Sequence, residues 1–184
     1  FLYNSLADQR QSNVGLNRTE YTVNGEIEFV KPYIEVSYLG TAQEFKRELL
    51  FKVSDLMINE MMYGGNLKEI FQSALLMNLS DWFVKGASEY VAKGWSSEMD
   101  DYVREVIRNK RINKIYRLTG REAAVIGQSF WNFIAEKYGK SSISNILNYT
   151  RITRKEEQSV LITLGINYKQ VIKEWQQYYS EMQA

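Results

Sequence analysis

The hydrophobic pattern divides the chain into a short strand-forming beginning and a long helical remainder. Strands are predicted where apolar and polar residues alternate, or where short apolar runs flank turn residues. These segments are residues 1–4, 20–23, 26–30 and 33–39. Asn24-Gly25 is typical of a two-residue hairpin turn. After Gly40 the apolar spacing changes to a period of about 3.6 residues. The pattern therefore predicts an α+β domain, with a small N-terminal β-sheet followed by a mostly helical bundle.

Helices are predicted wherever the helical spacing holds between glycine or turn residues. They cover residues 42–63, 66–77, 81–93, 98–111, 120–138, 141–149, 154–163 and 167–182, and residues 5–17 form a polar loop or a short helix. Thr41 and Glu44 have the spacing of a capping box. The helix that they begin is apolar on most sides, which predicts a buried central helix. Gly86 lies inside a helix, where it costs roughly 1 kcal/mol relative to Ala, so we expect a close helix crossing there.

The composition excludes several kinds of catalytic and metal-binding site. The 184 residues include no His and no Cys. A Ser-His-Asp triad, a Cys-His pair and any thiolate or imidazole metal ligand are therefore excluded. No Asp-rich loop has the calcium-binding spacing, so we expect no cofactor.

The charge balance argues against a nucleic-acid-binding protein, and the hydrophobic runs argue against a membrane helix. With 23 basic and 22 acidic residues, the chain lacks the positive charge expected of a nucleic-acid-binding protein. No apolar run reaches the roughly eighteen residues that a membrane helix needs. Length predicts one domain over residues 1–184. Residues 1–4 have the pattern of the middle of a strand, so we expect the numbering to begin inside a longer gene product.

One run carries a family resemblance. The sequence LSDWFVKGASEY at residues 79–90 resembles the motif L-P-x-W-F-x-E-G-x-A-E-Y of gluzincin metallopeptidases. The resemblance is close to the peptidase-MA-like branch of that group. In that family the first Glu of the motif completes a zinc site. Lys85 occupies its position here, and Glu89 occupies a position where the family keeps a carboxylate that supports the metal. Other segments that resemble the family are residues 3–15, 40–45, 128–139 and the run after Gly165.

The other zinc ligands of the family come from His-Glu-x-x-His on an earlier helix. Residues 40–45 resemble the entry to that helix and place the five-residue motif on residues 51–55. Phe51 and Asp55 then replace the two His ligands, and Lys52 replaces the general-base Glu. A phenyl ring cannot coordinate zinc, an ammonium group repels it, and one carboxylate is a poor site.

A second register places the motif on residues 59–63, with Glu60 in the position of the general base. Asn59 and Tyr63 would then replace both His ligands, and Lys85 would be unchanged. Neither register predicts a zinc enzyme.

The resemblance therefore implies a catalytically inactive zinc-peptidase-like domain, a pseudopeptidase that binds or scaffolds a protein or peptide. Because the metal positions converge in an active relative, we expect Asp55 and Lys85 to form an ion pair that Lys52 could join. Bacterial members of this group often precede a TolB-like β-propeller in secreted or periplasmic proteins. We therefore expect a periplasmic or secreted location, and a β-propeller in the same chain as one candidate partner.

Two alternatives stay open. One is a metal-independent hydrolase that uses carboxylates alone, for example Glu60 or Glu89 as base. The other is a purely structural spacer. A spacer predicts a filled cleft between the helices of Phe51 and Lys85, whereas a binding module predicts an open groove there.

Overall fold

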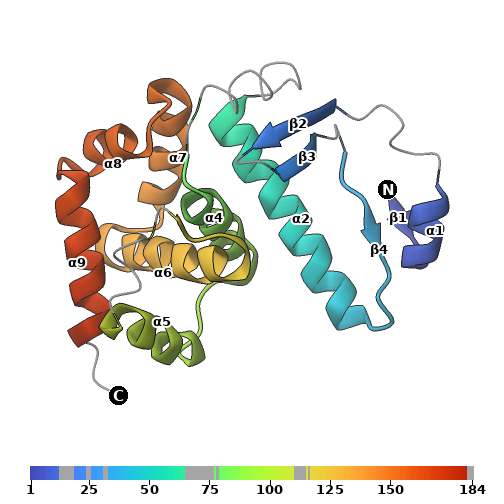
Figure 1. Cartoon of the computed structure of the whole chain (residues 1–184), viewed down its shortest axis with the longest axis horizontal. Helices are drawn as coiled ribbons and strands as arrows, with labels where there is room; N and C mark the ends of the chain where they lie inside the picture. Colours follow the sequence, from blue (N-terminus) through green and yellow to red (C-terminus); the bar gives the residue numbers. More distant parts are fainter. Residues whose placement is uncertain are drawn as a thin grey trace.

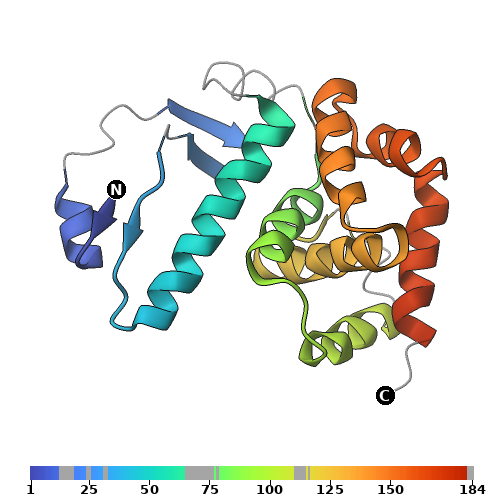
Figure 2. The ribbon, with the colours of Figure 1, turned by 180° about the vertical axis from the view of Figure 1, so that it is seen from behind.

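The computed structural model describes residues 1–12, 19–23, 26–30, 33–64, 77, 79–109, 115 and 117–181. In these residues the chain is mostly helical, with little β-structure, all of it near the N-terminus. Figure 1 shows the long helix α2 (Ala42–Tyr63) between the N-terminal strands on one side and the other large helices on the opposite side. Figure 2 shows the same arrangement from behind.

Within the described residues, the β-structure consists of two separate pairs of strands. β1 (Leu2–Tyr3) pairs in parallel with β4 (Val36–Ser37), and β2 (Thr19–Val23) pairs antiparallel with β3 (Glu26–Val30). Between β1 and β2 lies the short helix α1 (Leu6–Gln11). The predicted strands are confirmed, but the one predicted over residues 33–39 is reduced to β4. The predicted turn at residues 24–25 lies outside the described residues.

β4 also lacks the predicted alternation of buried and exposed side chains. Glu35, Val36 and Ser37 are all buried, with at most 8% of any of them exposed. The reason is that β4 contacts both β1 and α2. Polar groups in this segment are satisfied locally, since Tyr3 donates a hydrogen bond to the Glu35 carboxylate at 3.1 Å and Ser37 donates to the side chain of Gln9 at 2.6 Å.

The later helices follow the predicted order, and most of their bounds agree within a few residues. They are α4 (Asp81–Lys93), α5 (Glu98–Arg108), α6 (Gly120–Tyr138), α7 (Ser141–Thr153), α8 (Glu156–Leu164) and α9 (Tyr168–Glu181). The helix predicted over residues 66–77 lies outside the described residues, apart from the single position 77.

The start of α2 shows a modified capping box. The Thr41 hydroxyl oxygen accepts a hydrogen bond from the Glu44 amide at 3.1 Å, as predicted. The reciprocal bond differs from the prediction, because the Thr41 hydroxyl donates to the Glu44 carboxylate at 2.8 Å. Both contacts hold the same two residues together, and α2 begins at the predicted position.

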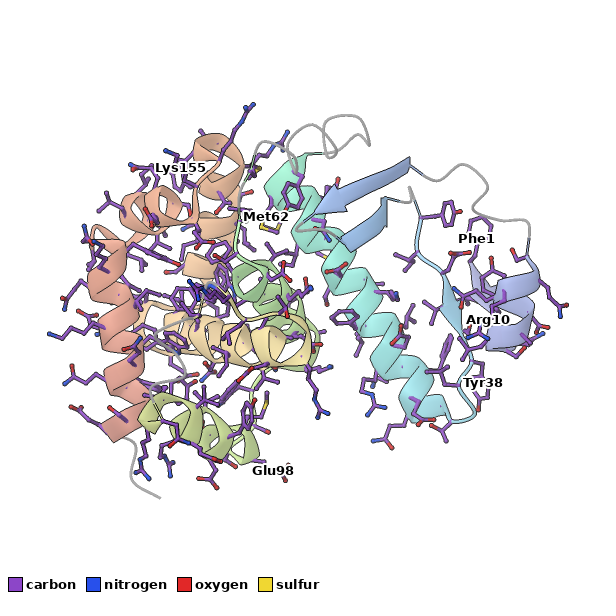
Figure 3. The ribbon with its side chains drawn as sticks, viewed as in Figure 1. Phe1, Arg10, Tyr38, Met62, Glu98 and Lys155 are labelled. Carbon is purple, nitrogen blue, oxygen red and sulfur yellow. The ribbon has the colours of Figure 1, made fainter. Side chains whose placement is uncertain are left out.

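The prediction that α2 is buried on most sides is wrong. Its buried residues form one narrow stripe at four-residue spacing, namely Ser54, Ile58 and Met62. Figure 3 labels Met62 near the end of α2 that packs against α7. Leu50, Val53, Leu56 and Met57 are 38–54% exposed. An apolar composition therefore does not indicate burial in this helix.

The core is centred on α6, and aromatic rings fill much of it. Trp82 of α4 and Trp175 of α9 are stacked with an interplanar angle of 3°, and Phe130 of α6 meets both rings edge-on. All three side chains have no exposed surface. The Trp131 indole donates a hydrogen bond to the Phe83 carbonyl at 2.8 Å, which ties α6 to α4 inside this core.

The predicted close crossing at Gly86 is confirmed. Gly86 of α4 lies against Gly127 of α6, and a Cβ atom built on Gly86 would stand 2.2 Å from the Gly127 carbonyl carbon. A Cβ atom on Gly127 would stand 1.7 Å from the Trp82 carbonyl oxygen. Both positions therefore require glycine, and the crossing fixes how α4 faces the space between it and α2.

Candidate functional site

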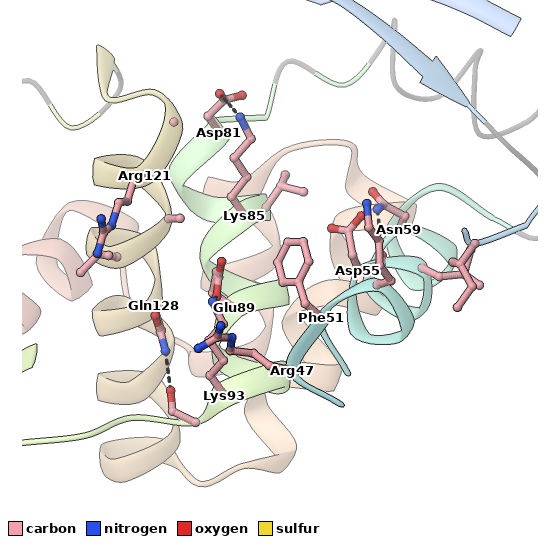
Figure 4. A pocket seen from close by; sticks show the side chains of 18 of the residues that line it. Arg47, Phe51, Asp55, Asn59, Asp81, Lys85, Glu89, Lys93, Arg121 and Gln128 are labelled. Carbon is pink, nitrogen blue, oxygen red and sulfur yellow. Dashed lines mark hydrogen bonds and ion pairs between the residues drawn. The ribbon is translucent and has the colours of Figure 1, made fainter. Parts of the chain in front are cut away.

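A cavity of about 1330 Å³ lies between the N-terminal segment, α2, α4 and α6. All five residues that the sequence assigns to the vestigial metal site line it, as Figure 4 shows for four of them. They are Phe51, Lys52 and Asp55 of α2, and Lys85 and Glu89 of α4. Positions that are thirty or more residues apart in the sequence thus face the same space.

One face of α2 forms a wall of this cavity. Arg47, Phe51, Asp55, Asn59 and Tyr63 all line it, and each is four residues after the previous one. Since an α-helix has 3.6 residues per turn, side chains at this spacing lie on one face. Asn59 and Tyr63 belong to the second register considered above, so both registers lead to this wall.

Asp55 connects α2 to α4 through a hydroxyl group. Ser88 of α4 is fully buried, and its Oγ donates a hydrogen bond to Asp55 Oδ1 at 2.8 Å. The Lys85 ammonium lies 2.9 Å from Asp81 Oδ2, one turn away on its own helix. Figure 4 shows Lys85 directed toward Asp81, away from Asp55.

The predicted ion pair between Asp55 and Lys85 is therefore wrong. Lys85 pairs with Asp81 on its own helix, so it does not need to reach across to α2. Asp55 accepts its hydrogen bond from Ser88 instead. Lys52 does not join Asp55 either, because its ammonium lies 3.8 Å from Glu48 on the same helix. The link between the two helices at this point is a hydrogen bond between a hydroxyl and a carboxylate.

Glu89 pairs with Lys93, one turn further along α4. The Lys93 ammonium also lies 5.7 Å from the centre of the Phe51 ring, which is within the range of a cation–π interaction. Phe51, in the position of the first family His, thus packs against a cation. The side chains of Phe51, Lys93 and Glu89 form a second contact between α2 and α4.

The far wall comes from α6. Arg121 lies in its first turn, and Gln128 donates a hydrogen bond to the Gly94 carbonyl at 2.6 Å, just after the end of α4. Glu60, the candidate base of the second register, is exposed and does not occur among the described residues that line the cavity.

Within the described part of the chain, no group of three or more His, Cys, Asp or Glu residues could hold a metal ion. The two carboxylates of the predicted site, Asp55 and Glu89, are engaged by Ser88 and Lys93. The cavity offers cations, carboxylates, amides and the aromatic rings of Tyr33, Phe51 and Tyr63. These groups can recognise a ligand by charge and hydrogen bonding.

Sequence reasoning missed Ser88, Lys93 and Arg121. A signal for Lys93 was present, because an acidic residue four positions before a lysine pairs better than the reverse order. That rule favours Glu89 with Lys93 over Glu89 with Lys85. Ser88 and Arg121 gave no such signal, since their roles depend on how α2 and α6 pack against α4.

No family model, curated protein sequence or solved structure matches the chain. The peptidase resemblance is thus carried by the motifs alone. Among the helices of the described residues, none combines the length and the apolar character needed to cross a bilayer.

Proposed function

We propose that this chain is a zinc-peptidase-like domain of gluzincin architecture without catalytic activity, which binds or scaffolds a protein or peptide. The binding site is the cavity between α2 and α4. The observation that carries the proposal is the convergence of Phe51, Lys52, Asp55, Lys85 and Glu89 on this one cavity. The family resemblance predicts that these positions meet in space.

The residue types favour binding over peptide hydrolysis. A peptidase of this kind needs three metal ligands and a base that activates water. The chain has no imidazole and no thiolate to supply. Asp55 is hydrogen-bonded to Ser88, and Glu89 is paired with Lys93, so neither carboxylate is positioned as a base with an activating partner.

The open cavity favours a binding module over a structural spacer. A spacer would fill the space between the helices of Phe51 and Lys85, whereas the structure has a cavity of about 1330 Å³ there. This is larger than the roughly 300–1,000 Å³ of most small-molecule pockets. A peptide segment of several residues therefore fits the space better than a small metabolite does.

The proposed location and partner rest on the resemblance alone. Bacterial members of the resembling group often precede a TolB-like β-propeller in secreted or periplasmic proteins. We propose a periplasmic or secreted location, with the propeller or another cell-envelope protein as the source of the bound segment.

A cavity-filling variant tests the proposal. Ala124 of α6 lines the cavity, so Ala124→Trp places an indole inside it. Binding of a fluorescein-labelled library of seven-residue peptides is measured by fluorescence anisotropy. We expect the wild-type domain to bind a subset of the peptides, and Ala124→Trp to lose that binding.

The control is Ala42→Trp, an exposed position at the start of α2 that does not line the cavity. Thermal melting of each variant verifies that the fold is kept. Equal binding by both Trp variants and the wild type, or no binding of any peptide, would contradict the proposal.

A further inference from the structure

The charged side chains of the cavity fall into two groups. One group is neutralised by a neighbour on the same helix. These pairs are Lys85 with Asp81, Lys93 with Glu89, and Lys52 with Glu48. In the described part of the chain, the guanidinium groups of Arg47 and Arg121 have no carboxylate partner, although both side chains line the cavity. The cavity therefore holds two cations that are available to a ligand.

These two arginines come from opposite walls. Arg47 lies on α2 and Arg121 lies in the first turn of α6. Figure 4 shows the two side chains on different helices of the cavity wall. Lys93, although paired, adds a third cation above the Phe51 ring. The lining thus combines an aromatic ring with two guanidinium groups that have no carboxylate partner among the described residues.

Carboxylates also line the cavity, among them Asp55 of α2 and Glu98 of α5. Asp55 is two helical turns beyond Arg47, a rise of roughly 12 Å along α2 at about 1.5 Å per residue. Its carboxylate is hydrogen-bonded to Ser88, and no cation pairs with it among the described residues. A uniformly anionic polymer would therefore meet a carboxylate at Asp55, which disfavours nucleic acids and polyphosphates.

We propose that the cavity selects peptides with acidic side chains, and that Arg47 and Arg121 bind their carboxylates. This inference rests on the proposed peptide-binding function and names the class of peptide. A guanidinium group donates two parallel hydrogen bonds to a carboxylate and stays charged at every physiological pH. Phe51, with Val84 and Val125 in the same lining, supplies apolar surface for the neighbouring residues of the peptide.

The test compares acidic peptides with uncharged peptides of the same shape. From the library, each bound sequence is synthesised with its Asp and Glu residues and again with Asn and Gln in their place. Both forms are titrated by fluorescence anisotropy at low salt. We expect the amide forms to bind about tenfold more weakly, because each loses a charge-assisted hydrogen bond.

Two variants assign the effect to the arginines. Arg47→Gln and Arg121→Gln each remove one exposed guanidinium without emptying the core. We expect each to weaken binding of the acidic form about fivefold to tenfold and to leave the amide form nearly unchanged. The matched control is Arg151→Gln, an exposed residue of α7 outside the cavity, which removes the same charge and keeps the preference.

The outcomes separate this inference from the proposed function. If acidic and amide peptides bind equally, and Ala124→Trp still abolishes both, the preference is refuted while peptide binding stands. If a single-stranded oligonucleotide binds instead, and Arg47→Gln removes it, the acidic-peptide assignment is also refuted. If no peptide binds the wild-type domain, the proposed function itself fails.

Discussion

Gly86→Ala tests whether the crossing of α4 and α6 determines the stability of the domain. The new Cβ atom would stand 2.2 Å from the Gly127 carbonyl carbon. Ordinary carbon contacts begin near 3.5 Å, so the two helices would have to separate by about 1 Å. The obstacle is backbone and not a flexible side chain, which means that no rotamer change relieves it.

The size of the effect follows from two opposing terms. Overpacking of a core typically costs about 1–3 kcal/mol, and a contact between backbones lies at the upper end of that range. Replacing Gly by Ala inside a helix recovers about 1 kcal/mol. We therefore expect a net loss of about 2 kcal/mol or more in the free energy of unfolding. Out of a typical stability of about 5–15 kcal/mol, this is a large fraction.

Urea unfolding followed by circular dichroism measures this loss. The matched control is Gly165→Ala, which also adds one methyl group but meets no atom within 4 Å. Its φ of +68° adds strain of about 1 kcal/mol, without any steric contact. If Gly86→Ala is as stable as the wild type, or more stable than Gly165→Ala, the assigned crossing is wrong.

Three further predictions concern buried or paired polar groups. Ser88→Ala removes the donor to Asp55 and should cost about 1–2 kcal/mol in urea unfolding; a loss near zero would show that this bond does not stabilise the α2–α4 contact. The pKa of Glu174 is lowered to about 2, mainly because Lys137 donates a hydrogen bond to its carboxylate. The ionised Glu174 therefore stabilises the folded protein above the usual pKa of 4.5, and this stabilisation is lost as the pH falls toward 2. Glu174→Gln should flatten the stability profile in that window, and an unchanged profile would refute the assignment. Burial raises the pKa of Glu156, so the pH dependence of stability is opposite to that of Glu174. The protonated Glu156 stabilises the folded protein below pH 4.5, and this stabilisation is lost as the pH rises through the pKa of the folded state. Glu156→Gln should remove that decline, and a decline that persists would assign it to another group.

Local sequence signals were sufficient to predict most of the helical part. α6 has the predicted bounds, and α4 ends before Gly94 as predicted. The close approach at Gly86 could also be predicted, because a glycine inside a helix loses stability unless packing requires it. Motif resemblance pointed to Phe51, Lys52, Asp55, Lys85 and Glu89, which line the cavity, although it left two registers open on α2.

Features that depend on packing between elements could not be predicted. α2 has apolar residues on most sides, yet Leu50, Val53 and Met57 are exposed. Only the stripe of Ser54, Ile58 and Met62 is buried in this helix. The partner of Asp55 depended on which α4 side chain reaches it first, and that is Ser88. The spacing of residues within α2 does not predict which side chain of α4 will donate a hydrogen bond to Asp55.

We propose that this cavity binds a peptide without metal and without cleaving it. The most direct measurement is a titration of the wild-type domain with a selected acidic peptide, in chelator and in added zinc, followed by mass spectrometry of the peptide. We predict equal affinity in both conditions, intact peptide and no bound zinc in the folded protein. Stoichiometric zinc, or hydrolysis that depends on zinc, would contradict the account.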